Sequence, residues 1–155
     1  MEYAVKRGRL YDGGNERVRY RLEYPTGIGR EGINSFCGKI AENCENYCKE
    51  ELYTQARESG QKYLYELDIL VTHSDERAVS LLIRARLSAG RQLICQRIRT
   101  VSWDVRTQLM IPPRMLARKY GERGRKIPKG AAVFLCEGRL ESVDRADDDI
   151  FRCKK

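Results

Sequence analysis

A stripe of apolar residues that repeats at spacings of three and four over residues 33–57 narrows the possible folds more than any other feature. These spacings place side chains on one side of an α-helix, and charged and amide residues fill the other side. The sequence therefore predicts a long amphipathic helix, which should end near Gly60 because glycine adopts the left-handed conformation that caps helices. The stripe consists of Ile33, Phe36, Cys37, Ile40, Ala41, Cys44, Tyr47, Cys48 and Leu52.

Alternating apolar and polar residues predict strands on both sides of this helix. Residues 17–24 alternate strictly, with Val18 and Tyr20 on one side and Arg19 and Arg21 on the other, as in a strand with one buried face. Pro25 and the glycines that follow it should end this strand. Further strands are predicted at residues 62–72, 78–88, 91–103 and 131–136, with a polar turn at 73–76.

The register of the last long hairpin decides which side chains share a face. If Ala89 and Gly90 form its two-residue loop, the apolar residues of both strands stay largely on one face. In this register Ala85 lies opposite Ile94, Ile83 opposite Gln96 and Leu81 opposite Ile98.

These elements predict a single α+β domain over residues 1–143. One long helix packs on one face of a mainly antiparallel meander, and the other face of the sheet is exposed to water. A short helix should begin at Pro113, because proline suits the first helical position. The chain has 155 residues of which 41% are hydrophobic, which is enough for one core, and residues 144–155 are predicted to form a charged tail.

The environment of the protein is predicted to be the cytoplasm. No run approaches the ~20 apolar residues that cross a bilayer, and the first ten residues carry charges where a signal peptide needs apolar ones. Membrane insertion is therefore not expected. The six cysteines are predicted to be free thiols, and Cys37, Cys44 and Cys48 to pack in the core as small apolar side chains.

No group of residues points to catalysis. The only histidine, His73, lies beside Ser74 and Asp75 in a predicted turn, but nucleophile, base and orienting acid are assembled from distant segments in known triads. We expect an exposed turn histidine. The chain has no Cys-x-x-Cys pair, no dinucleotide fingerprint and no P-loop. The sequence thus predicts a protein that is not an enzyme and that has no metal or cofactor.

Positive charge gathers in one part of the chain. The net charge is +8, and residues 84–125 hold eleven cations against two acids. Such a surplus suits nucleic acid or another polyanion, and arginine can bind phosphates and carboxylates through two hydrogen bonds. The alternative, which we prefer, is that Glu66 and Asp68 on the neighbouring strand pair with these arginines. The candidate binding residues on the outer face are Arg84, Arg86, Arg97, Arg99, Arg17, Arg19 and Arg21.

The order of elements resembles the extracytoplasmic domain of RsiV-type anti-sigma factors, a family that includes many domains of unknown function. The similarity spans residues 18–140 and is carried by YELDILVTHSDERAVSLLI at 65–83, WDVRT at 103–107 and LMIPPRML at 109–116. It implies the α+β fold and a sensory or binding role. Signalling through a sigma factor is not expected, because no membrane span or sigma-binding segment is found in these residues.

The functional hypothesis is therefore a non-catalytic domain that binds an unknown protein or small ligand. The alternative is an RNA- or DNA-binding protein that uses the arginine-rich face of the sheet.

Overall fold

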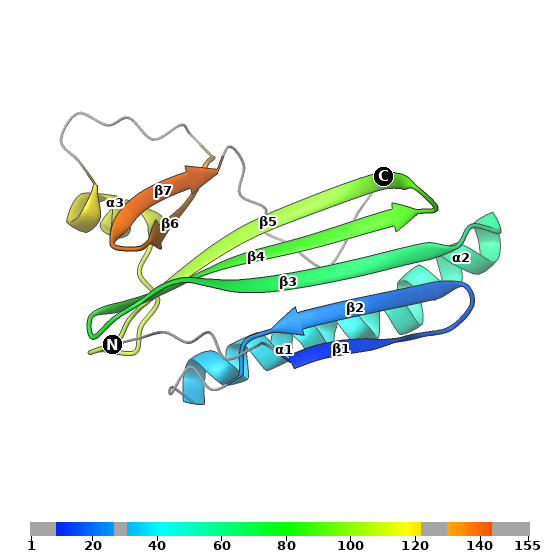
Figure 1. The fold of residues 1–155 in the computed structure, drawn as a ribbon, viewed down its shortest axis with the longest axis horizontal. Helices are drawn as coiled ribbons and strands as arrows, with labels where there is room; N and C mark the ends of the chain where they lie inside the picture. Colours follow the sequence, from blue (N-terminus) through cyan, green and yellow to red (C-terminus); the bar gives the residue numbers. More distant parts are fainter. Residues whose placement is uncertain (1–8, 27–30, 122–129, 144–155) are drawn as a thin grey trace.

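A five-stranded sheet forms the centre of the molecule in a computed structural model that describes residues 9–26, 31–121 and 130–143 (Figure 1). Its strands are β1 (Arg9–Gly14), β2 (Val18–Tyr24), β3 (Tyr63–Ser74), β4 (Ala78–Ala89) and β5 (Gln92–Asp104), which lie in that order across the sheet. The strands β3, β4 and β5 form the antiparallel meander that their alternating residues predict. The strand β1, which the sequence did not predict, pairs with β2 as an edge hairpin.

The predicted amphipathic helix is present and lies along β1 and β2 (Figure 1). Gly60, at φ 71°, follows its last turn as expected. The apolar stripe is buried against the sheet, where the hydroxyl of Tyr65 donates a hydrogen bond to Sγ of Cys44 at 3.3 Å. The helix consists of α1 (Glu31–Tyr47), a π-helical turn (Cys48–Leu52) and α2 (Tyr53–Ser59).

This helix explains the one parallel pair in the sheet. The chain leaves β2, crosses one face of the sheet as a helix and returns to begin β3, so that both strands run in the same direction. Val18 lies opposite Tyr63, and Leu22 lies opposite Leu67. The α+β class is thus confirmed, with a mixed sheet in which the helix covers one face.

The opposite face of the sheet is covered at one end, whereas we expected it to be exposed throughout. The short helix α3 (Pro113–Tyr120) begins at the predicted proline, and β6 (Ala132–Cys136) continues through a tight turn into β7 (Arg139–Val143), which the sequence did not predict. Together they lie at one end of the long strands (Figure 1). They enclose a second apolar cluster of Ala78, Leu116, Val133, Leu135 and Leu140.

Several hydrogen bonds fix this second layer to the sheet, one of them from the backbone N–H of Glu137 to the carbonyl oxygen of Thr72 at 3.3 Å. The backbone N–H of Leu135 donates to Oγ of Ser80 at 3.1 Å, and Oγ of Ser80 lies 2.6 Å from Oγ of Ser102. The backbone N–H of Gly138 donates to Nδ1 of His73 at 3.0 Å. The hairpin β6–β7 is therefore held through side chains of β3, β4 and β5.

The predicted charged tail at 144–155 lies outside the described residues, so the proposed domain boundary at residue 143 stays a prediction. Among the residues that the structure describes, no helix is long and apolar enough to cross a membrane.

Candidate functional site

The predicted register of the β4–β5 hairpin is wrong by three residues. The loop consists of Gly90 and Arg91, since Ala89 pairs with Gln92, and a bulge after Leu87 adds one further residue to β5. An odd shift moves side chains to the other face of a sheet. The pairs that result are Ala85 with Arg97, Ile83 with Arg99 and Leu81 with Val101.

The bulge divides the seven candidate arginines between different surfaces. Arg97 and Arg99 share the face of Ala85 and Ile83, which is the face on which the helix packs, and not the outer face predicted for them. Arg17 is exposed just before β2. The arginines that do share the outer face are Arg19, Arg21, Arg84 and Arg86.

On this outer face the arginines alternate with acids across the strands. Glu66 of β3 lies between Arg21 of β2 and Arg86 of β4 in register, and Asp68 lies opposite Arg84. Nη2 of Arg84 donates to Oδ2 of Asp68 at 3.0 Å, which confirms the predicted pairing at this position. Among the described residues, Glu66 makes no such ion pair.

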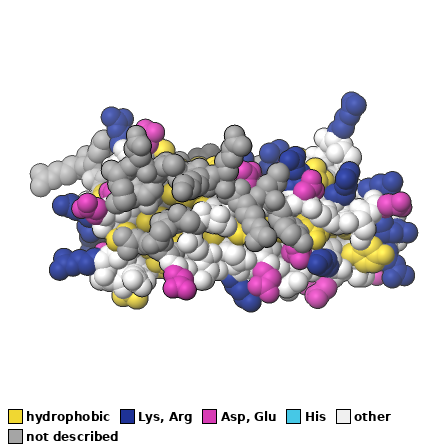
Figure 2. All heavy atoms as spheres, turned by 60° about the horizontal axis from the view of Figure 1, so that its bottom comes forward, with side chains coloured by type: hydrophobic (Ala, Val, Ile, Leu, Met, Phe, Trp, Pro, Cys, Tyr) yellow, Lys and Arg dark blue, Asp and Glu magenta, His cyan; other side chains and the backbone are white. Residues whose placement is uncertain are grey.

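This alternation removes the surplus of positive charge that a phosphate platform needs. Four acids, Asp12, Glu23, Glu66 and Asp68, share this face with the four outward arginines, and each arginine except Arg19 stands in register with one of them. Figure 2 shows both signs of charge along the length of another face of the molecule. The arginine-rich face of the sheet therefore resembles a mixed-charge surface more closely than a polyanion-binding one.

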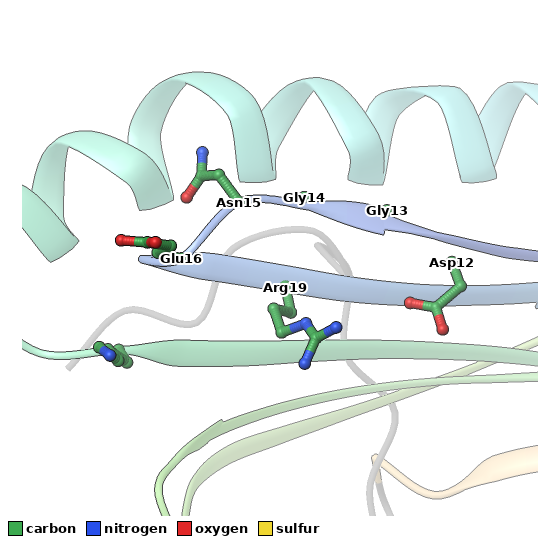
Figure 3. A pocket seen from close by; sticks show the side chains of 7 residues that line it. Asp12, Gly13, Gly14, Asn15, Glu16 and Arg19 are labelled. Atoms are coloured by element: carbon green, nitrogen blue, oxygen red, sulfur yellow. The ribbon is translucent and has the colours of Figure 1, made fainter.

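An open cleft of about 810 Å³ lies at the end of the β1–β2 hairpin (Figure 3). The side chains of Asp12 and Arg19 extend over the sheet toward β3, while Glu16 stands at the tip of the hairpin. The tip is rigid because Oδ1 of Asn15 accepts hydrogen bonds from the backbone N–H groups of residues 17 and 18, at 2.8 and 3.0 Å. Its charged side chains are all exposed and of both signs, so the cleft shows no preference for one class of ligand.

His73 is not the exposed turn residue that we expected. Its side chain is only 10% exposed, and Nδ1 accepts the hydrogen bond from Gly138. In the neutral ring the proton is then on Nε2, which lies 2.9 Å from Oδ2 of Asp75 and donates to it. Nδ1 therefore attaches the β6–β7 turn to the sheet, and Nε2 holds the ring against the turn between β3 and β4.

The helix cysteines Cys37, Cys44 and Cys48 are buried thiols, as predicted. Burial raises the pKa of Cys37 to about 12 and raises that of Cys48 further, so both are held as neutral thiols. Within residues 9–26, 31–121 and 130–143, no cluster of His, Cys, Asp or Glu has the arrangement of a metal site.

Cys95 contradicts the prediction of six free thiols, because it is disulfide-bonded. Cys95 lies beside the bulge of β5, where it pairs with Leu87 of β4. Disulfides persist mainly in oxidising compartments. The cytoplasmic location predicted from the sequence therefore stays a prediction.

The most distinctive surface is an apolar groove of about 550 Å³ that the sequence analysis did not identify. One wall is the segment 109–112, which leaves the end of β5, and the other is α3. Three large apolar side chains are exposed together here: Leu109 is 66% exposed, Met115 59% and Met110 49%. Apolar side chains that gather at the surface of a folded domain commonly mark a binding site.

The first wall of the groove is held rigidly by Asp104. Its Oδ1 accepts hydrogen bonds from the backbone N–H groups of Thr107 and Arg106, at 3.0 and 2.9 Å. These bonds, that of Thr107 first, lower the pKa of Asp104, and the positive charge of Lys119 lowers it further. The backbone N–H of Ile111 then donates to the carbonyl of Ser102 at 2.8 Å, which keeps the segment beside β5.

The second wall is the outer side of α3. Met115, Arg118 and Lys119 share this side because their spacing is three and four residues. Leu116, on the opposite side, is buried in the second apolar cluster. The apolar residues at 109–111, followed by two prolines and then by cations, were visible in the sequence, but nothing in the sequence distinguished an exposed wall from a core segment.

No protein-family model matches this chain, and no curated protein matches it either.

Proposed function

We propose that this protein is a non-catalytic domain that binds another protein through the groove between residues 109–112 and α3. The observation that carries the proposal is the joint exposure of Leu109, Met110 and Met115 on two walls that the fold holds in place. A rigid groove loses little conformational entropy when a partner binds, so more of the contact energy contributes to affinity. Methionine suits such surfaces because its flexible side chain adapts to different partners.

The resemblance to RsiV-type domains fits this proposal, because it implies a binding role without chemistry. Cys37 and Cys48 are buried as neutral thiols, and the ring of His73 is engaged in structural hydrogen bonds. None of these three side chains is therefore placed as a nucleophile or base in an open cavity.

Methionine NMR offers a direct test, since the chain has only three methionines and two of them line the groove. We would label the methionine methyl groups with ¹³C and add amphipathic peptides whose apolar residues follow helical spacing. We expect at least one peptide to shift the signals of Met110 and Met115 and to leave that of Met1 in place. If no peptide of acidic, neutral or basic composition shifts either groove signal, the proposed function is wrong.

A matched pair of variants controls for non-specific binding of the peptides to exposed apolar side chains. Leu109→Ser removes an apolar wall residue, whereas Leu93→Ser removes another exposed leucine at the far end of β5. We expect only the first variant to weaken peptide binding. Equal weakening by both would show that the peptides bind apolar surface without preference for the groove.

Nucleic-acid binding by the outer arginines is the alternative function. It predicts that single-stranded RNA binds with a log–log salt slope near ~3, because each of four phosphate contacts contributes ~0.7. It also predicts that this binding is lost when Arg19, Arg21, Arg84 and Arg86 are replaced together. The alternating acids lead us to expect weak RNA binding that does not depend on these four residues.

A further inference from the structure

We infer that the partner segment that occupies this groove is acidic and amphipathic, with apolar side chains that enter the groove and carboxylates that face its rim. The inference rests on the proposed function and adds the chemistry of the partner.

The segment that forms the groove carries a surplus of positive charge. Residues 104–121 contain four cations (Arg106, Arg114, Arg118 and Lys119) and one acid (Asp104). Arg118 and Lys119 line the groove itself, next to Met115. Within the described part of the chain, neither Arg114 nor Arg118 forms an ion pair, so their charges are available to a ligand.

The single acid of this segment offsets only one of its four positive charges. The carboxylate of Asp104 accepts two backbone hydrogen bonds within its own turn, and these already use its Oδ1 atom. Lys119 lies 5.6 Å from the centre of the Tyr120 ring, which leaves its ammonium group at the surface. A partner carboxylate would therefore meet cations without displacing an existing ion pair.

The size of the groove favours a few anchoring side chains. A volume of about 550 Å³ lies within the ~300–1,000 Å³ that is usual for ligand pockets, so it suits several apolar side chains and not a whole helix. Helical peptides that dock in apolar grooves present such anchors on one side. Opposite charges at the rim then raise the association rate and set the orientation.

Three peptides separate this inference from the proposed function. They share the same apolar residues at helical spacing and differ only in their polar positions, which are all Glu, all Gln or all Lys. Binding is followed by the methyl signals of Met110 and Met115. At low salt we expect the Glu peptide to bind about tenfold more tightly than the Lys peptide, with the Gln peptide between them.

Charge reversal supplies the matched test on the protein. In Arg114→Glu/Arg118→Glu we expect the order of affinities to reverse, so that the Lys peptide binds most tightly. Arg57→Glu/Arg91→Glu introduces the same change in charge away from the groove and should keep the original order. Circular dichroism checks that each variant is folded. Since all four positions are exposed, folding should be preserved.

Salt dependence of the unmodified protein provides an independent measurement. Raising the ionic strength from about 0.05 to 0.5 M shortens the Debye length from above 10 Å to a few ångströms, so binding of the Glu peptide should weaken several-fold and that of the Gln peptide little. Equal affinities of the three peptides would overturn the inference but leave the proposed function intact. Failure of all three would overturn both. Displacement of the bound Glu peptide by single-stranded RNA at similar concentration would show a nucleic-acid site instead.

Discussion

Replacement of Ser80 by alanine tests how the second layer is attached to the sheet. Oγ of Ser80 accepts the backbone N–H of Leu135 at 3.1 Å and lies 2.6 Å from Oγ of Ser102, and all three residues are buried. The substitution leaves the N–H of Leu135 without an acceptor, which costs about 1–3 kcal/mol, and removes the bond between the hydroxyls, which adds about 1 kcal/mol. The free energy of unfolding should thus fall by about 2–4 kcal/mol.

Ser102→Ala is the matched control. It removes the bond between the hydroxyls but leaves Ser80 to accept from Leu135, so the free energy of unfolding should fall by only about 1 kcal/mol. Urea denaturation measures both values. In a chain of this size the melting temperature should fall by roughly 4–16 °C for Ser80→Ala and by roughly 2–4 °C for the control.

Hydrogen exchange adds a local measurement to the same experiment. The amide of Leu135 should lose protection in Ser80→Ala and keep it in Ser102→Ala. Equal destabilisation by the two substitutions, or a loss below about 0.5 kcal/mol for Ser80→Ala, would refute the reasoning that the second layer depends on this acceptor.

Three further predictions concern the core, the redox state and the loop beside the groove. Leu52→Ala, at a fully buried position of the helix, should lower the free energy of unfolding by about 2–5 kcal/mol in urea denaturation, and a loss below about 1 kcal/mol would contradict its burial. Alkylation of the unfolded, unreduced protein should modify the four other described cysteines, and peptide mapping should find Cys95 modified only after reduction. The turn at Asp104 should be stable above pH 3.8, the ordinary pKa of the carboxyl, because a lowered pKa in the folded state stabilises wherever the carboxylate is ionised. That contribution should disappear as the pH falls through the lowered pKa, and methyl signals of Met110 that stay unchanged down to pH 2 would contradict it.

The elements that depend on local periodicity were predicted well from the sequence. The apolar stripe at residues 33–57 predicted the helix, Gly60 its end and Pro113 the start of α3, because each of these depends on neighbouring residues only. The alternation in residues 17–24 predicted β2 and the face that it buries. The strands β1 and β7 were missed, since the glycines of the first and the shortness of the second weaken the alternating pattern.

Which side chains are exposed, and on which face of the sheet they lie, was by contrast determined by the tertiary structure. A single extra residue in β5, opposite Leu87 and Ser88, moved Arg97 and Arg99 to the face of the helix, and no local pattern marks where a strand bulges. The same limit applies to the groove. The sequence shows that Leu109, Met110 and Met115 are apolar, but apolar residues occur in cores and at binding surfaces alike. Only the way in which α3 packs, with Leu116 inward and Met115 outward, determined that these three side chains remain exposed together, because exposure depends on which distant segments cover a residue.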